Sequence, residues 1–307
     1  MAKLTLIFLQ LIFFILVAPF LSGLITKIKN SCRMRKGQSI LQPYYNLIKL
    51  FSKKPVISET VSWIFKVAPF MLISSTLTVA LCIPVFILQS PLYYMGDFIA
   101  IIFIFALGRF FLALAALDTG SSFGGMGSSR EMFISSLVEP ALCLVVFSVF
   151  LQFGSTNLSV FSGMHAVSVA STVGAMALFL VVIAETSRVP VDNQETHLEL
   201  TMVHEAMLLE YSGAGLALIE LSAQVKQMIW FFLIAQIIFP IAAPGAVNLS
   251  GLFYWVMWYL ARILIIVIAV ALVEVSVAKM RLFRVVDFLG FVFVLGVVAS
   301  ICAILGV

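Results

Sequence analysis

The sequence has 307 residues, of which 63% are hydrophobic and 10% are charged. A soluble domain averages about 45–50% apolar and about 25% charged residues, so this composition excludes an ordinary soluble fold and indicates a protein that crosses a membrane several times. The net charge of +4 is modest, and a surface that mostly faces lipid makes nucleic-acid binding unexpected. The four cysteines lie far apart, so we expect no metal, iron–sulfur cluster or other cofactor in this chain.

A membrane-spanning helix requires about 20 mostly apolar residues. Eight segments meet this condition and predict an all-α membrane protein, with a single polytopic domain over 1–307. The first apolar run is too long for a signal peptide and lacks an A-x-A cleavage site, so we expect it to remain as a span. The expected spans are 4–26, 63–88, 97–117, 131–152, 166–187, 224–246, 251–275 and 284–305.

Basic residues are concentrated in alternate connections between these spans. Fifteen of the eighteen Lys and Arg residues lie in or beside the connections after the first, third, fifth and seventh spans, and the other three connections have none. Because Lys and Arg are enriched on the cytoplasmic side, these four connections should face the cytoplasm and both termini should lie outside. We therefore expect a multi-pass protein of the cell (inner) membrane.

The first cytoplasmic connection contains a segment, Leu41–Pro55, with the pattern of an amphipathic helix. Its apolar residues recur with a period near 3.6, and its lysines lie elsewhere. Such a helix is typical of the membrane interface, where a basic anchor on anionic lipid is the simplest role. The apolar positions are Leu41, Tyr44, Tyr45, Ile48 and Phe51.

The segment Leu117–Glu131, LDTGSSFGGMGSSRE, is rich in glycine and serine and lies at a cytoplasmic helix end. Glycine permits positive φ angles and close approach of the backbone, so we predict a flexible loop here. A phosphate-binding loop is not expected, because the segment lacks a Lys-Ser/Thr ending and a following soluble helix.

Three charged residues, Arg109, Glu139 and Arg262, fall inside the expected spans. Each such charge costs about 2.5–3.5 kcal/mol on insertion scales, so all three require partners or water. Two interpretations remain open: an interhelical ion pair, with Arg109 and Glu139 as the obvious partners, or a proton path. Burial disfavours the charged form of a carboxylate, which allows proton exchange near neutral pH. Glu185 and Glu274, near cytoplasmic helix ends, could extend such a path or merely reach the interface.

Six of the fourteen acidic residues lie in one cytoplasmic stretch, Glu185–Gly213, ETSRVPVDNQETHLELTMVHEAMLLEYSG. Pro190 should end the fifth span or turn the chain. If a helix follows it, Asp192, Glu195 and Glu199 share one face, and their repulsion should keep a proton on at least one of them. Asp192 and Glu195 also fit a capping box that simply starts a helix.

The rest of this long acidic cytoplasmic loop, 188–223, is partly apolar, so it should pack against another subunit or against the other cytoplasmic loops. Its two histidines, His197 and His204, lack the H-E-x-x-H spacing of a zinc site. We therefore expect no metal site in the loop.

Several segments carry a resemblance to a known family. They are RKGQSILQPYYNLIKLFSKKP, the helix that contains Glu139, ETSRVPVDNQE and EYSG, in this order among eight spans. The chain resembles subunit 1 of the respiratory complex I family. LDTGSSFGGMGSSRE and LVEPALCL are closer to the hydrogenase branch, whose counterpart is formate hydrogenlyase subunit 4, the membrane subunit of formate hydrogenlyase and related energy-converting hydrogenases.

The resemblance implies a membrane subunit of an oxidoreductase complex, with no catalytic centre of its own. Such a subunit docks a cytoplasmic arm that holds iron–sulfur clusters and a nickel–iron hydrogenase subunit, and leads protons or charge changes toward antiporter-like subunits. The candidate residues on the proton path are Glu139, Glu185, Asp192, Glu195, Glu199 and Glu210. The candidate charge partners are Arg109, Arg188 and Arg262, and the candidate arm-docking residues are Arg35, Lys36, Gln42, Pro43 and Lys49.

Three other functions remain open. A quinone-site subunit 1 of a complex I-type NADH dehydrogenase would share the fold, although quinone-using members usually have Gly-Pro where this chain has Gly37-Gln38. A stand-alone secondary ion transporter should have two similar halves with broken helices, and the sequence contains no such repeat. A pure scaffold would tolerate neutralisation of Asp192, Glu195 and Glu199 together.

Overall fold

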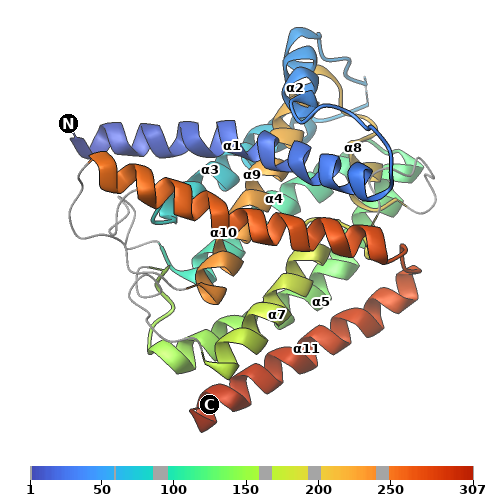
Figure 1. Cartoon of the computed structure of the whole chain (residues 1–307). Coiled ribbons are helices and arrows are strands. Elements are labelled where there is room, and N and C mark those ends of the chain that lie inside the picture. Colours follow the sequence, from blue (N-terminus) through green and yellow to red (C-terminus); the bar gives the residue numbers. More distant parts are fainter. Residues whose placement is uncertain are drawn as a thin grey trace.

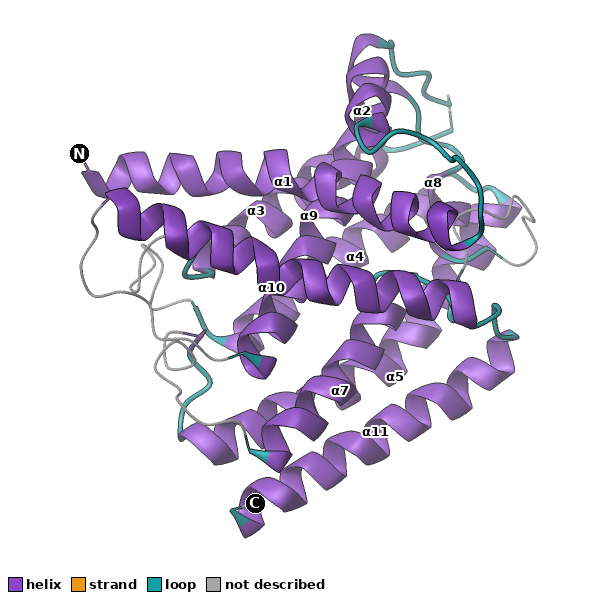
Figure 2. Ribbon diagram, viewed as in Figure 1, coloured by secondary structure: helices purple, strands orange, loops and turns teal. Residues whose placement is uncertain are grey.

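The structure is a computed structural model. It describes residues 2–58, 60–85, 96–158, 168–192, 202–239 and 249–306, with 2–6, 249–253 and 255 described as backbone only. All regular elements in these residues are helices, apart from one isolated antiparallel bridge between Asp97 and Asn157 (Figure 2). The helices are α1 (Ala2–Cys32), α2 (Gln42–Ser52), α3 (Trp63–Cys82), α4 (Phe98–Asp118), α5 (Ser122–Phe153), α7 (Val169–Glu185), α8 (His204–Leu208), α9 (Gly213–Ile238), α10 (Leu249–Ser276) and α11 (Leu282–Leu305).

Seven of the described helices, α1, α3, α4, α5, α9, α10 and α11, are long and apolar enough to cross a membrane. The shorter apolar helix α7 has 17 residues, which at 1.5 Å per residue is about 26 Å. This length is at the lower limit for a span. The predicted fold class, an all-α protein with about eight membrane helices and an amphipathic helix, is confirmed.

The helix α5 begins earlier than the sequence pattern predicts. The expected flexible loop over Leu117–Glu131 is wrong, because α5 starts at Ser122 with Ser121 as its N-cap. The glycines allow close helix packing rather than a loop. A Cβ at Gly127 would lie 2.9 Å from the Ala206 Cβ and 3.0 Å from the Val203 carbonyl oxygen. Glycine therefore lets α5 lie directly against α8.

The helix α9 also begins earlier, at Gly213 rather than at 224. Polar residues, including Glu220 and Gln224, lower the hydropathy of its first turns and hide them from an apolar-run criterion. The loop expected over 188–223 is correspondingly shorter and contains the single-turn helix α8.

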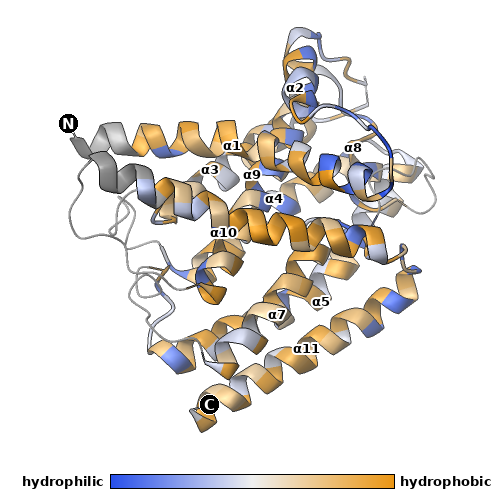
Figure 3. Ribbon diagram, in the orientation of Figure 1, coloured by the Kyte–Doolittle hydropathy of each residue, from blue (hydrophilic) through white to orange (hydrophobic). Residues whose placement is uncertain are grey.

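The helices form one bundle around α9, which packs against α1, α2, α3, α7 and α10. The helix α11 packs against α5 and α7, and α3 packs against α4. The N-terminus lies at the upper left of Figure 1 and the C-terminus at its bottom, left of centre, whereas α8 and the α10–α11 connection lie at its right. Hydrophilic residues gather in α2, in the α1–α2 connection and around α8 (Figure 3).

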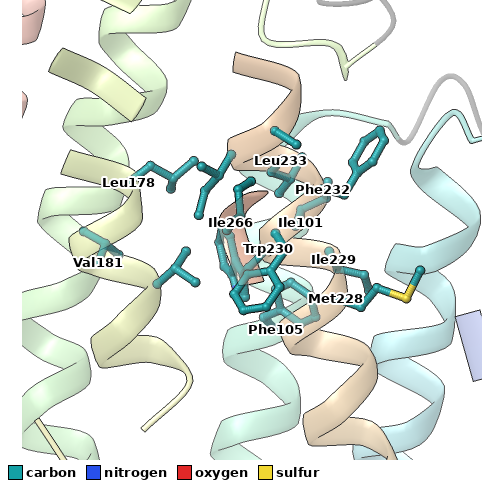
Figure 4. Close-up of a cluster of buried hydrophobic side chains, with 14 of the residues drawn as sticks. Ile101, Phe105, Leu178, Val181, Met228, Ile229, Trp230, Phe232, Leu233 and Ile266 are labelled. Atoms are coloured by element: carbon teal, nitrogen blue, oxygen red, sulfur yellow. The ribbon is translucent and has the colours of Figure 1, made fainter. Parts of the chain in front are cut away.

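A continuous apolar core fills the centre of the bundle. Trp230 of α9 is completely buried, and its ring lies 5.5 Å from the Phe105 ring of α4. Figure 4 shows side chains from several helices, including Leu178 and Ile266, converging around Trp230. This core fixes α9 and α4 relative to each other and so positions the charged side chains one to two turns away.

Candidate functional site

Four charged side chains from four helices meet in the interior, and we call them the central ion cluster: Arg109, Glu139, Glu185 and Lys226. Arg109 of α4 donates from Nη1 to Glu185 Oε2 at 2.7 Å and from Nη2 to Glu139 Oε1 at 2.9 Å. Lys226 Nζ lies 2.8 Å from Glu185 Oε1. The ion pair expected between Arg109 and Glu139 is therefore present.

The members of the central ion cluster differ in exposure. The side chains of Arg109 and Glu185 are 7% and 2% exposed, whereas Glu139 is 43% exposed. Glu185 thus lies between two cations at the end of α7, and Glu139 occupies the outer edge of the cluster on α5. Protonation of Glu139 should cost less free energy than protonation of Glu185. Glu139 pairs with one cation, whereas a neutral Glu185 would leave two buried cations without a charged partner.

Two residues of this site were missed at the sequence level. The sequence pattern counts the charge of Lys226, at the start of the expected span 224–246, with the neighbouring connection, and it places Glu131 at the end of the glycine-rich segment. Glu131 is 8% exposed and acts electrostatically on Arg109, as do Glu185 and Glu139. Glu131 therefore joins the central ion cluster, in which three carboxylates act on Arg109 and Glu185 also pairs with Lys226.

A small internal cavity of about 60 Å³ lies beside the central ion cluster, and we call it the inner cavity. It is large enough for ordered water, which needs roughly 10–15 Å³ and several polar partners. Its polar lining comprises Ser75, Thr76, Arg109, Glu131, Glu185, Thr186, Ser187, His204, Ser222 and Lys226.

A second cavity of about 180 Å³, the outer cavity, is more open and is lined by Arg188, Glu205, Glu220 and Gln224 among other residues. The two cavities share four wall residues from three segments: Thr186, His204, Ile219 and Ala223. His204 and Thr186 are the polar members of this shared wall. The outer cavity therefore adjoins the inner cavity through a wall that contains one histidine and one hydroxyl.

A second group of charges, the lateral ion cluster, consists of Lys29, Arg188, Gln227 and Glu274. Lys29 of α1 donates to Glu274 Oε2 at 2.8 Å, and Arg188 donates to Glu274 Oε1 at 2.9 Å. Arg188 also donates to Gln227 Oε1 at 2.8 Å. The Glu274 side chain is 2% exposed, so these contacts fasten α10 to α1 and α9.

Asp192 joins the α7–α8 connection to the α10–α11 connection. Its Oδ1 accepts from Lys279 Nζ at 2.7 Å, and its Oδ2 accepts from the backbone N–H groups of Val203 and His204. The Met280 N–H also donates to the Pro190 carbonyl at 2.8 Å. Asp192 thus caps α8, eleven residues further along the chain, and holds the connection between α10 and α11.

The remaining candidates lie apart from the central ion cluster. Arg262 is buried and donates to Gln236 and to the Phe239 carbonyl, near the C-terminal end of α9 and away from Lys226 in the middle of that helix. Glu210 is exposed. Glu195, Glu199 and His197 lie outside the described residues. Of the docking candidates, Arg35, Lys36 and Lys49 are exposed, and Gln42 and Pro43 are partly buried.

The EYSG segment has a structural role that its sequence did not reveal. Tyr211 stacks on Phe65 at 4.0 Å between ring centroids and donates to the Phe65 carbonyl at 3.0 Å. The Ser212 hydroxyl accepts from the Val56 N–H and donates to the Val56 carbonyl. Gly213 has a φ of 57°, and a Cβ there would lie 2.8 Å from the Lys53 carbonyl oxygen. We call Tyr211–Gly213 with 53–56 the clasp, because it ties the exit of α2 to the start of α9.

Comparison with known proteins agrees with this architecture. A family model described as NADH dehydrogenase matches residues 4–305. Hydrogenase-4 component C of Escherichia coli is 33% identical over 92% of this chain and 90% of the relative. Formate hydrogenlyase subunit 4 of the same organism is 31% identical over 87% of each chain.

More distant matches extend to other respiratory complexes. NADH-quinone oxidoreductase subunit 8 of Rhodothermus marinus is 27% identical over 65% of this chain and 60% of the relative. One chain in the structure of the membrane-bound sulfane sulfur reductase, an archaeal respiratory membrane complex, superimposes with a TM-score of 0.82. That match covers 99% of this chain and 100% of the other at 18% identity, so it supports the fold alone.

Proposed function

Since the chain belongs to the NADH dehydrogenase family over nearly its whole length, we propose that it is the integral membrane subunit of a hydrogenase- or formate hydrogenlyase-type oxidoreductase complex. In this proposal it docks a cytoplasmic arm and couples electron transfer in that arm to proton translocation through buried carboxylates. The hydrogenase relatives support this branch, since they match at higher identity and over more of the chain than the quinone oxidoreductase subunit does.

The proposal places the iron–sulfur clusters and the nickel–iron centre in partner subunits of the arm, with antiporter-like subunits beside this chain in the membrane. The chain itself would carry no electrons. The α1–α2 connection and α2 form the proposed docking surface, because they contain the exposed basic residues Arg35, Lys36 and Lys49. Removal of these charges should weaken retention of the arm during purification without changing the fold of the bundle.

We further propose that the complex lies in the cell (inner) membrane, with both termini of this chain outside. Two observations support this orientation. The connections rich in Lys and Arg are the alternate ones, and in Figure 1 the α10–α11 connection and α8 lie at the opposite end from both termini. The outer cavity and the clasp would then face the cytoplasmic arm.

One observation carries the coupling mechanism: the outer and inner cavities share a wall and lead from a polar opening to the central ion cluster. Water in the outer cavity can deliver a proton to His204, whose ring can take it up on one nitrogen and release another from the second nitrogen. The proton then reaches the carboxylates around Arg109. A change in the arm would alter the connection that holds His204 through Asp192.

The charge balance of the cluster suits proton storage. Glu131, Glu139 and Glu185 are the carboxylates that act on Arg109, and Lys226 supplies one further cation. A carboxylate in excess of the nearby cations is the group that can bind a proton without leaving a cation unpaired. Glu139 is best placed for release, because it lies at the exposed edge.

The direct test is Glu139→Gln in the assembled complex, reconstituted in liposomes with a pH-sensitive dye inside. We expect proton movement per electron transferred to fall by about tenfold, because glutamine cannot exchange the proton. The melting temperature should change little, because Arg109 keeps its shorter and more enclosed ion pair with Glu185. Glu210→Gln is the matched control, because Glu210 is an exposed carboxylate outside the cavities. Unchanged proton movement in Glu139→Gln would rule out the proposed path.

The role of His204 is tested separately by His204→Ala and rescue with imidazole in the outer solution. We expect the variant to lose most proton movement and to recover it as imidazole is added, because the outer cavity is open to small solutes. A purely structural role would not respond to imidazole.

A quinone site is the second candidate, and the outer cavity is the relevant observation. Its volume of about 180 Å³ is below the roughly 300–1,000 Å³ of typical ligand pockets, and its lining is predominantly polar. Both features favour water over an isoprenoid quinone. Inhibition of the purified complex by a quinone analogue at micromolar concentration would reverse this preference.

A further inference from the structure

The clasp creates a groove that the proton path does not use. Its walls are Phe65 and Pro69 of α3, Tyr211 at the clasp, and Gly215 and Leu218 of α9, and its volume is about 300 Å³. Phe65, Pro69 and Tyr211 are buried, so the inner wall is rigid and apolar. A Cβ at Gly215 would meet only ordinary contacts, at 3.6 Å from Tyr211 and 3.8 Å from Pro69. The glycine at 215 is therefore not required by close packing, and the groove beside it is unfilled space.

The rim of the groove is basic on one side. Lys66 belongs to the lining itself. Lys53 and Lys54 immediately precede Pro55 and Val56, which form the loop wall. All three lysines are exposed, and in the part of the chain that the structure describes none of them forms an ion pair.

The outer side of the groove continues into a surface suited to acyl chains. Phe70 of the lining is 63% exposed, and Trp63, at the start of α3, is 67% exposed. Tryptophan at the end of a spanning helix is typical of the membrane–water interface. The groove thus has an apolar interior, an opening at the level of the interface and positive charge above it.

We propose that this groove binds one phospholipid with an anionic headgroup. An acyl chain lies between α3 and α9, and the phosphate and additional headgroup charge lie against Lys66 and the lysines of the α2–α3 loop. Three uncompensated lysines at one rim select an anionic headgroup over a zwitterionic one, since each contributes about 1 kcal/mol of attraction to anionic lipid. A neutral quinone would fill the apolar walls without using this charge.

The bound lipid would also have a mechanical effect. The groove lies under the clasp, whose hydrogen bonds at Ser212 and Val56 hold the end of α2 to α9. A lipid that fills the space behind Tyr211 would stabilise the clasp and hence the position of α2. Lipid depletion should therefore loosen α2 without altering the central ion cluster.

The experiment is native mass spectrometry of the purified complex after exchange into detergent with defined mixtures of phosphatidylglycerol and phosphatidylethanolamine. We expect each complex to retain one phosphatidylglycerol molecule that is bound to this chain. Lys66→Gln should lower its occupancy by about fivefold. Gly215→Leu, which fills the groove with a side chain, should abolish it. Arg284→Gln is the control, because Arg284 is an exposed basic residue on α11 outside the lining and should leave occupancy unchanged.

Each alternative outcome has a definite meaning. Equal retention of phosphatidylethanolamine, or equal loss in Lys66→Gln and Arg284→Gln, would overturn the proposal of headgroup selection. Retention of a quinone in place of a phospholipid, abolished by Gly215→Leu but not by Lys66→Gln, would overturn the proposed ligand. Proton movement in Gly215→Leu separates this site from the proton path, because it should stay at the level of the unmodified complex although the lipid is lost.

Discussion

The two ion clusters of this protein contain similar residue types but differ in the ratio of carboxylates to cations. In the lateral ion cluster a single carboxylate, Glu274, lies between the cations Lys29 and Arg188. In the central ion cluster the carboxylates Glu131, Glu139 and Glu185 outnumber Arg109 and Lys226. The first arrangement keeps its carboxylate charged, whereas the second leaves one acid that can be protonated without stranding a cation.

The surroundings reinforce this difference. The carboxylate of the lateral ion cluster is enclosed, with its side chain 2% exposed. The central ion cluster borders a cavity, and its edge residue Glu139 is 43% exposed. The lateral ion cluster reaches the outer cavity only through Arg188 and Gln227, and Glu274 lines neither cavity, which favours a structural fastener. Glu131 and Glu185 line the inner cavity, which favours proton exchange. The comparison predicts that neutralisation damages stability at one cluster and coupling at the other.

The largest loss of stability is expected for Glu274→Gln. It leaves Lys29 and Arg188 without their shared carboxylate in a buried place, which typically costs about 3–5 kcal/mol. The expected result is a lower melting temperature and poor recovery of the assembled complex, measured by fluorescence-detected size-exclusion chromatography after heating. If Glu274→Gln and Glu139→Gln proved equally stable, the contrast between fastener and exchange site would disappear.

A smaller loss is expected for Asp192→Asn. The amide keeps one acceptor oxygen for α8 but removes the ion pair with Lys279, so the cost should be about 1–3 kcal/mol. Because Asp192 holds His204, the variant should also reduce proton movement more than Glu210→Gln does. Hydrogen exchange of the peptides around α8 and Met280 measures the local part of the effect. Unchanged exchange there would mean that Asp192 does not connect these segments.

Tyr211 lies in neither ion cluster, so its replacement shows the stability cost of losing one buried hydrogen bond of an uncharged side chain. Tyr211→Phe keeps the stack on Phe65 but loses one hydrogen bond, at a cost of about 0.5–1.5 kcal/mol near pH 8. Burial, with a smaller contribution from the Asp118 carboxylate, raises the pKa of Tyr211 in the folded protein.

This shift fixes the sign of a pH dependence. The stability that comes from the neutral phenol is present in full below the unfolded pKa of about 10 and is lost as pH rises above it. The stability gap between the unmodified protein and Tyr211→Phe should therefore shrink between about pH 9.5 and 11. A gap that stayed constant over this range in thermal melts would contradict the buried, neutral phenol.

The sequence was sufficient for the features that depend on composition and depth. Apolar runs predicted the helical architecture, and the similar depth of Arg109 and Glu139 predicted their ion pair. The sequence was insufficient where polar residues lie in the first turns of a largely buried helix. The first turns of α9 look like a loop by hydropathy, although Ser222 and Lys226, four residues apart, share one helix face.

Close packing was the second obstacle. Gly127 lies in a glycine-rich segment that is typical of a loop, yet it allows α5 to pack closely against α8. No local sequence pattern reveals this contact. The same misassignment hid Glu131, four residues beyond it on the same helix. The role of Gly213 could have been suspected, because a glycine after EYS suggests a positive φ, but its contact with Lys53 depends on a distant segment.

The smallest loss of stability, and the sharpest test of the comparison, is expected for Glu131→Gln. Removal of this carboxylate leaves Arg109 paired with both Glu139 and Glu185, so stability should change by less than about 1 kcal/mol. The cluster would then hold as many cations as acids, like a closed network, and would lose its spare site for a proton. Proton movement per electron should fall toward the level of Glu139→Gln in the same liposome assay. If Glu131→Gln left coupling intact, the excess of acid over cation would not be what distinguishes the central ion cluster, and the exposure of Glu139 alone would have to account for the difference.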